Sequence, residues 1–291
     1  MKRQGRQALL GICVMGMLAL AGCGGQSPAD SSGQELAADA LVQQTKDTLE
    51  HTDSYTAHFL ATVKMADVEE TTTEAAVCFV EEPLYMQVDA MISMDGATQG
   101  STTYLAENGD KVDLYMNYNQ QWTEMTMDRE AAMKNLQIYH MLDNMAILLD
   151  AGQGWELTQD GDGLELTATI PESDFYTVEE RARLFQLAGL SGLSEDYFHD
   201  LGDVSLRVTL DQKTQEPLSY EIDLTQALEA VTNNVLLELN GGTLENGVNV
   251  ESYVLSSSFS KLGNVGPKEI PQEARSSAVN YEEEFTLMVG K

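Results

Sequence analysis

The stretch "LYMQVDAMISMDG", residues 84–96, places an apolar side chain at every second position and ends in Asp95-Gly96. Successive side chains of a β-strand point to opposite faces, so a period of two puts the apolar set on one face. The stretch therefore predicts an antiparallel strand with one buried face, followed by a tight turn. The apolar set is Leu84, Met86, Val88, Ala90, Ile92 and Met94.

The same alternation recurs along most of the chain. Asn108-Gly109 is a strong hairpin-turn signal, and Asp160-Gly161-Asp162-Gly163 marks a second turn between alternating segments. About eleven strands are predicted from this pattern. Among them are the segments 54–65, 84–94, 101–107, 111–118, 121–127, 155–159, 164–171, 204–210, 218–224 and 247–260.

Helical patterns separate groups of these strands. The longest, residues 129–151, repeats apolar residues at helical spacing and is followed by Gly152. Thr177-Val178-Glu179-Glu180 forms a capping box, which predicts a helix over 177–187. This arrangement predicts an α+β protein with one large antiparallel sheet, and leaves open whether it forms one half-barrel or two lobes. Further helices are predicted at 34–51, 194–201 and 225–236.

The N-terminus has the pattern of an export signal. Basic residues at positions 2, 3 and 6 precede an apolar stretch, 8–22, which at about 15 residues is shorter than the ~20 that a transmembrane helix needs. Its end, Leu20-Ala21-Gly22-Cys23, resembles the lipobox of bacterial lipoproteins, which implies that Cys23 is lipidated. Two acyl chains, such as palmitate, bind a membrane stably where one is marginal. We therefore expect a lipid-anchored extracytoplasmic protein; the alternative is an ordinary signal peptide with an incidental Cys.

The chain is strongly acidic. It carries 16 Lys and Arg against 47 Asp and Glu, a formal net charge of −31, which becomes −34 once the three cations of residues 1–22 are removed. Such a surface repels nucleic acids and anionic lipid head groups, so we expect no nucleic-acid partner. The acidic residues are spread along the chain and predict a solvated coat, with binding of divalent cations or basic polymers as the alternative.

Motifs for catalysis or metal binding are incomplete. The four His residues, at 51, 58, 140 and 199, form no zinc-binding pattern. Asp160 and Asp162 resemble part of a calcium loop, but its register requires acids at 158 and 169, where Thr stands. Ser258-Phe259-Ser260-Lys261 matches an S-x-x-K motif without its companion motifs. We expect a protein that is not an enzyme and has no metal or cofactor, with Cys78 as a buried hydrophobic residue.

Four short patterns, taken with the order of predicted elements, carry a family resemblance. They are Leu20-Ala21-Gly22-Cys23, Ser54-Tyr55, Leu114-Tyr115-Met116 with Trp122, and Ile270-Pro271-Gln272-Glu273-Ala274. On these residues the chain resembles the lipoprotein-carrier superfamily, the LolA-like half-barrels, and more narrowly tethered LolA-like lipoproteins of Gram-positive bacteria. The resemblance implies a curved sheet that wraps helices around an apolar cavity for a lipid or acyl chain, with 129–151 as a lid.

This resemblance and the composition divide the chain into four parts. They are a lipoprotein signal peptide (1–22), a flexible tether (23–34), a LolA-like α+β domain (35–275) and an acidic C-terminal tail (276–291).

Methionine is concentrated in one part of the chain. Ten of the eleven Met residues that follow the leader lie between positions 65 and 145. Flexible, polarizable side chains suit an exchangeable apolar ligand, although they fill an irregular core equally well. The candidate ligand-binding residues are Phe59, Met86, Val88, Met94, Leu114, Met116, Leu142 and Met145.

Three functions follow from these observations. The first is a monomeric, membrane-anchored lipoprotein that binds a lipid, an acyl chain or another hydrophobic small molecule between the sheet and the lid helix. The alternative is a non-enzymatic cell-envelope interaction or structural lipoprotein with a filled core, which acts through its acidic surface. A hydrolase ranks third, because it would need Ser, His and Asp, or a metal cluster, to converge in a cleft.

Overall fold

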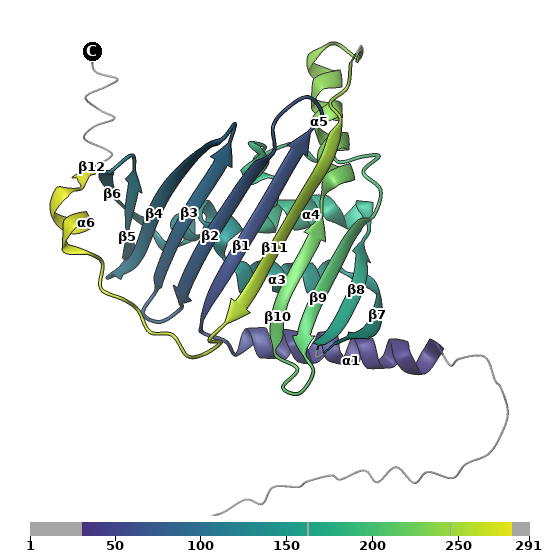
Figure 1. Cartoon of the computed structure of the whole chain (residues 1–291), viewed down its shortest axis with the longest axis horizontal. Helices are drawn as coiled ribbons and strands as arrows, with labels where there is room; N and C mark the ends of the chain where they lie inside the picture. Colours follow the sequence, from purple (N-terminus) through teal and green to yellow (C-terminus); the bar gives the residue numbers. More distant parts are fainter. Residues whose placement is uncertain (1–30, 162, 245, 281–291) are drawn as a thin grey trace, which may run out of the picture. The chain divides into compact units, whose positions relative to one another are not determined.

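The alternating segments pair into one large curved sheet (Figure 1). The computed structural model describes residues 31–280, except 162 and 245. Twelve strands lie in the order β12-β6-β5-β4-β3-β2-β1-β11-β10-β9-β8-β7. Their bounds are β1 Ser54–Met65, β2 Thr71–Val80, β3 Tyr85–Met94, β4 Ala97–Asn108, β5 Lys111–Tyr118, β6 Gln121–Asp128, β7 Gln153–Asp160, β8 Gly163–Ile170, β9 Val204–Asp211, β10 Pro217–Asp223, β11 Val250–Ser260 and β12 Val279–Asn280.

The predicted hairpins fix the register of the sheet. Asn108 pairs with Lys111 across the Asn-Gly turn, and Met94 pairs with Ala97 across the Asp-Gly turn. Every neighbouring pair is antiparallel except β12, whose two residues lie parallel to β6. The two groups of predicted strands therefore belong to one sheet, joined where β1 pairs with β11. The predicted α+β class with a large curved antiparallel sheet is confirmed.

All the helices except α6 contribute to a core on one face of this sheet, called here the inner face (Figure 1). α3 and α4 lie behind the central strands, and α5 packs on β11. Within residues 31–280, apart from 162 and 245, no helix combines the length and apolarity needed to cross a membrane. The helices are α1 Ser31–Glu50, α2 Arg129–Asn135, α3 Met141–Ala151, α4 Glu172–Ala182, α5 Thr225–Leu239 and α6 Gln272–Ser277, with short 3₁₀ turns at Gln137–Tyr139, Gln186–Ala188 and Glu195–Tyr197.

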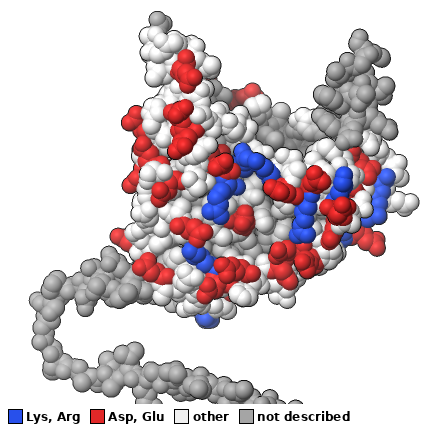
Figure 2. Space-filling model, turned by 180° about the vertical axis from the view of Figure 1, so that it is seen from behind, with Lys and Arg blue, Asp and Glu red and all other residues white. Residues whose placement is uncertain are grey.

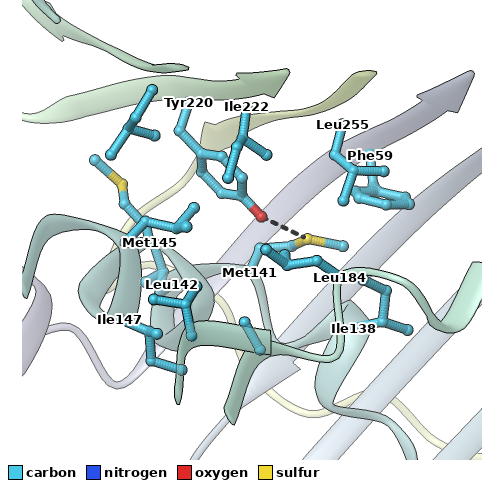
Figure 3. Close-up of a cluster of buried hydrophobic side chains, with 14 of the residues drawn as sticks. Phe59, Ile138, Met141, Leu142, Met145, Ile147, Leu184, Tyr220, Ile222 and Leu255 are labelled. Atoms are coloured by element: carbon cyan, nitrogen blue, oxygen red, sulfur yellow. Dashed lines mark hydrogen bonds between the residues drawn. The ribbon is translucent and has the colours of Figure 1, made fainter. Parts of the chain in front are cut away.

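The main core lies between the inner face and the helices. Apolar side chains from alternate strand positions, such as Phe59 and Ile222, pack against α3 and α4 as one buried cluster. Figure 3 shows Tyr220 from β10 reaching α3, where its hydroxyl donates to the sulfur of Met141 at 3.7 Å. The sheet and helices are thus joined by apolar burial with a few polar contacts inside it.

A second, smaller cluster covers part of the outer face. Aromatic side chains of β3 to β6 are buried there under the segment that follows β11. That segment contributes Ile270 and Ala274, so the Ile-Pro-Gln-Glu-Ala pattern closes the domain over Trp122. Cys78 is buried in this cluster, as predicted, and burial raises the pKa of its thiol.

The predicted continuous helix over 129–151 is wrong. The chain forms α2, a 3₁₀ turn and α3, with breaks at Leu136 and His140. Asn144 compensates the break, because its buried side-chain amide donates to the carbonyl oxygens of Gln137 at 3.0 Å and Ile138 at 3.3 Å. The carbonyl of Gln137 also accepts the backbone N–H of His140 at 2.8 Å, so the Asn144 amide supplements the backbone bonding at the break. No Gly or Pro marks the position in the sequence.

The predicted start of the next helix is also wrong. α4 begins at Glu172, directly after Pro171, and Glu172 and Asp174 supply the acidic first turn. The capping box at 177–180 is not used as an N-terminus. Glu179 instead lies near the end of α4, buried, and its carboxyl accepts the backbone N–H of Phe185 at 3.0 Å. It therefore supports the chain where the helix ends at Arg183, which has a left-handed φ of 59°.

Other predicted helix bounds differ by less. The helix expected at 194–201 is only the 3₁₀ turn Glu195–Tyr197. The one expected at 34–51 begins at Ser31, and the one expected at 225–236 extends to Leu239. Near the first of these segments, the distant carboxylate of Glu172 accepts the N–H groups of Asp200 and Gly202.

Candidate functional site

Most of the ligand-binding residues predicted from the sequence lie together in the main core. Phe59, Met86, Val88, Leu114, Leu142 and Met145 are all buried in the same cluster. Figure 3 shows Phe59 from β1 and Leu142 and Met145 from α3 within it. Met86 on β3 and Met145 on α3 have no exposed surface.

Two members of the predicted set lie elsewhere. Met116 is half-buried at the margin of the cluster. Met94 is 52% exposed, and its neighbour on the same strand face, Ile92, is 45% exposed. The inner face is therefore open at this end of β3, and Met94 does not join the core.

A cleft of about 410 Å³ opens where the N-terminal end of α3 meets the ends of β1 and β2. We call it the sheet–helix cleft. Its lining residues come from the end of α1, the sheet, α2 and α3. They are Leu49, Glu50, Thr52, Tyr55, Phe79, Glu81, Leu84, Arg129, Met133, His140, Leu142, Asp143 and Ala146.

The walls of the sheet–helix cleft are mainly apolar. Tyr55 and Phe79 stand on the inner face with ring centroids 5.4 Å apart, and both rings are buried. Opposite them, α3 presents Leu142 and Ala146. Leu142 is the member of the sequence-predicted set that lines this cleft. The arrangement offers an alkyl chain aliphatic and aromatic surface on two sides.

Polar groups are placed at the base of the cleft. The buried hydroxyl of Tyr55 faces the backbone N–H groups of Met141 and Leu142, in the first turn of α3, but forms no hydrogen bond of normal geometry. Burial raises the pKa of Tyr55, so the hydroxyl stays neutral. The imidazole of His140 lies against Phe79 with ring centroids 4.5 Å apart, and burial lowers the pKa of His140.

Charged side chains surround the opening. Glu50, Glu81 and Asp143 contribute three carboxylates, and Arg129 contributes one guanidinium. Arg129 donates from Nη2 to the carbonyl oxygen of Glu81 at 3.3 Å. The Nδ1 atom of His140 is 3.8 Å from a carboxylate oxygen of Asp143, which opposes the effect of burial on the imidazole. The cleft is thus apolar inside and net negative at its rim.

The metal-binding and catalytic motifs considered from the sequence can be placed in the described part of the chain. Between residues 31 and 280, leaving out 162 and 245, no three His, Cys, Asp or Glu side chains are placed to hold a metal ion. The S-x-x-K segment lies at the end of β11, with Ser258 in the strand and Lys261 directly after it. Cys23, the predicted lipidation site, lies outside the described residues.

The chain was compared with known proteins. No protein-family model matches it, and no curated protein matches it. Similar solved structures include LprF from Mycobacterium bovis, with 12% identity and a TM-score of 0.41 over 81% of this chain and 96% of that chain. A LolA superfamily protein from Nitrosomonas europaea has 9% identity and a TM-score of 0.24 over 81% and 96% of the two chains.

A third similar structure is a beta-barrel-like protein of a domain of unknown function from Brucella abortus. It has 8% identity and a TM-score of 0.22, over 72% of this chain and 97% of that chain. All three likenesses have TM-scores below 0.5 and identities of 12% or less.

Sequence reasoning missed most of the cleft. Tyr55 was noted only as part of the Ser54-Tyr55 pattern, and His140 was considered only as a metal ligand. Phe79 and Leu84 carried a usable signal, because both occupy alternating apolar positions at the end where β2 and β3 meet. Arg129, Met133 and Ala146 reach the cleft because the helix breaks at 136–140, and the break itself had no signal in the sequence.

Proposed function

We propose that this protein is a lipid-anchored extracytoplasmic lipoprotein that binds an apolar ligand, a lipid or an acyl chain, in the sheet–helix cleft. The observation that supports binding is the cleft itself, which is walled by Tyr55, Phe79 and Leu142 and has a volume of about 410 Å³. Small-molecule sites typically measure about 300–1,000 Å³ and combine apolar walls with a few polar groups.

The arrangement of polarity favours an amphiphile. An alkyl chain would lie between the aromatic side chains of the inner face and Leu142 of α3, where burial from water stabilises it. The head group would remain at the charged opening. α3 forms one wall of this cleft, so it takes the place of the predicted lid.

The anchor in this proposal rests on the sequence. The basic start, the short apolar stretch and Leu20-Ala21-Gly22-Cys23 support lipidation at Cys23, and residues 23–34 would tether the domain to the membrane. A monomer held near the bilayer in this way would meet its ligand at the membrane surface. Incorporation of labelled palmitate, lost in the Cys23→Ala variant, tests this part.

Ligand binding is tested with a variant that fills the cleft. Ala146→Phe adds a ring to a partly buried position that lines the cleft. Ala230→Phe on α5 is the matched control, because Ala230 is also partly buried against the main core but does not line the cleft. Both variants are made in the full chain carrying Cys23→Ser and purified without detergent.

Native mass spectrometry with monododecanoylglycerol gives the readout. We expect one ligand per chain in the parent and in Ala230→Phe, and none in Ala146→Phe. Binding that persists in Ala146→Phe, with the fold intact by circular dichroism, would place the ligand elsewhere. If the parent chain binds no amphiphile, the result would support the alternative function, a cell-envelope interaction or structural lipoprotein that acts through its acidic surface. The complete burial of Met86 and Met145 is consistent with the filled core of that alternative.

A further inference from the structure

We propose that the sheet–helix cleft selects its ligand by head-group charge and takes a single-chain amphiphile whose head group carries no negative charge. This inference rests on the proposed function, since it concerns the same cleft. Its evidence is the set of charged side chains at the rim, which distinguishes this cleft from a plain apolar groove.

Three carboxylates border the opening. Glu50 ends α1 and Glu81 follows β2, and both are exposed. Asp143 lies in the first turn of α3 with its side chain 44% exposed. A fatty-acid carboxylate or a phosphate held at this rim would face like charges, which lowers its affinity. A hydroxyl, an ester or an ammonium head group would not.

The positive groups at the rim do not offset these carboxylates. Arg129 is the one guanidinium or ammonium among the lining residues, and it already donates to the carbonyl oxygen of Glu81. His140 is half-buried against Phe79, and burial lowers the pKa of its imidazole, which disfavours the charged form. The formal balance of the rim is therefore one cation against three anions.

The wider surface acts in the same direction. Figure 2 shows the helix-covered side of the protein, where acidic side chains outnumber basic ones. The formal charge of −31 repels anions over a distance set by the ionic strength. The contribution of the rim must therefore be separated from that of the whole surface.

Size limits the ligand as well. A volume of about 410 Å³ lies toward the lower end of the range for ligand sites. Phe79, Leu84 and Leu142 form part of its apolar lining. One alkyl chain fits this description better than the two chains of a phospholipid.

The test compares three amphiphiles with the same twelve-carbon chain length: dodecanoate, monododecanoylglycerol and dodecyltrimethylammonium. Binding to the full chain carrying Cys23→Ser is measured by calorimetry below the micellar concentrations. We expect the ester and the ammonium to bind at least about fivefold more tightly than dodecanoate at low ionic strength, because three carboxylates oppose one guanidinium. High salt should narrow this difference.

Two triple variants separate the rim from the surface. Glu50→Gln, Glu81→Gln and Asp143→Asn together should bring dodecanoate to within about twofold of the ester, since the like charges at the rim are gone. The control variant carries Glu69→Gln, Glu70→Gln and Asp95→Asn, which change the net charge by the same amount as the rim variant. These residues lie in the turns at the ends of β1, β2 and β3 that are farther from the cleft. The control should keep the original difference.

Each outcome is decisive. If dodecanoate binds the parent as tightly as the ester does, the proposed selection by head-group charge is wrong, while the proposed function stands. A control that removes the difference as fully as the rim variant does overturns the role of the rim. If none of the three amphiphiles binds the parent, the proposed function fails and the selectivity fails with it.

Discussion

Replacing Glu179 by Gln should make the protein more stable at alkaline pH. The Glu179 carboxyl is buried near the end of α4 and accepts the backbone N–H of Phe185 at 3.0 Å. Burial raises the pKa of this carboxyl from 4.5 to about 8, although nearby N–H groups and Arg183 act in the opposite direction. At neutral pH the folded protein therefore holds Glu179 mainly protonated, and Gln mimics that neutral form.

The sign and size of the effect on the free energy of unfolding follow from the difference between the pKa of Glu179 in the folded protein and its pKa in the unfolded chain. In the unfolded chain Glu179 ionises near 4.5, whereas in the folded protein it keeps its proton up to about pH 8. The stabilisation is therefore complete below pH 4.5 and is lost as the pH rises through about 8. Each pH unit of separation corresponds to ~1.4 kcal/mol, so the full loss is ~5 kcal/mol. The Gln variant should not show this loss.

Urea denaturation followed by circular dichroism, at several pH values from 5 to 9, measures the effect. We expect similar free energies of unfolding for the two proteins near pH 5, and an advantage for Glu179→Gln that grows toward pH 9. Glu180→Gln is the control, because Glu180 is adjacent but exposed. Parallel pH profiles for wild type and Glu179→Gln would refute the argument that this carboxyl is held protonated by burial.

Four further predictions concern the break between α2 and α3, the main core, the cluster on the outer face and the lipid anchor predicted at Cys23. Asn144→Leu should lower the free energy of unfolding by about 2 kcal/mol in urea titrations, because the buried carbonyl of Ile138 loses the Asn144 amide, while that of Gln137 keeps the backbone N–H of His140; an unchanged midpoint would contradict this. Met145→Ala should cost about 2–5 kcal/mol by the same assay, since the side chain is fully buried. Cys78 should react slowly with a thiol reagent in the native protein and faster in Ile270→Ala, which loosens the cluster that covers it; equal rates would count against that packing. Cys23→Ala should move the protein out of the membrane fraction, and retention there would argue against lipid anchoring.

The sheet was predictable because its signals are local. Alternation at Met86, Val88 and Ala90 follows from the geometry of the strand, and the structure buries all three. Asn108-Gly109 and Asp95-Gly96 set the hairpins, because each turn requires a residue that tolerates positive φ. The joining of the two strand groups was open in the sequence, since β1 and β11 are separated by most of the chain. Such long-range pairing leaves no local pattern.

The helices were less predictable because tertiary contacts set their ends. The capping box at 177–180 has the right composition for an N-terminus, but Pro171 starts α4 earlier and Val178 is buried in the helix interior. Glu179 then accepts hydrogen bonds beyond the helix end, in a role that no spacing rule distinguishes from capping. In the same way, Asn144 compensates the break near Leu136 through contacts that only the folded chain provides.

The candidate site was half predictable for the same reason. Periodicity identified which residues face inward, such as Phe59 and Leu142, and both are buried. Periodicity does not show how far helices cover that face, so Met94 was placed with the core although 52% of it is exposed. The sheet–helix cleft lies near Phe79, where the helices stop covering the inner face. Its location therefore depends on the position of α3 and not on the strand pattern.

The break between α2 and α3 connects the error in the helix prediction to the site. In one continuous helix over 129–151, Met133 and Leu142 would lie along a single axis; in the structure they line the same cleft from separate helices. The break also exposes the first N–H groups of α3, at Met141 and Leu142, to the hydroxyl of Tyr55. At the break the buried amide of Asn144 donates to the carbonyl of Ile138, and a buried amide is costly for a core unless its hydrogen bonds are made. Natural sequences depart from local helix rules mainly where function requires it, so the break favours the sheet–helix cleft over the packed region around Met145 as the binding site.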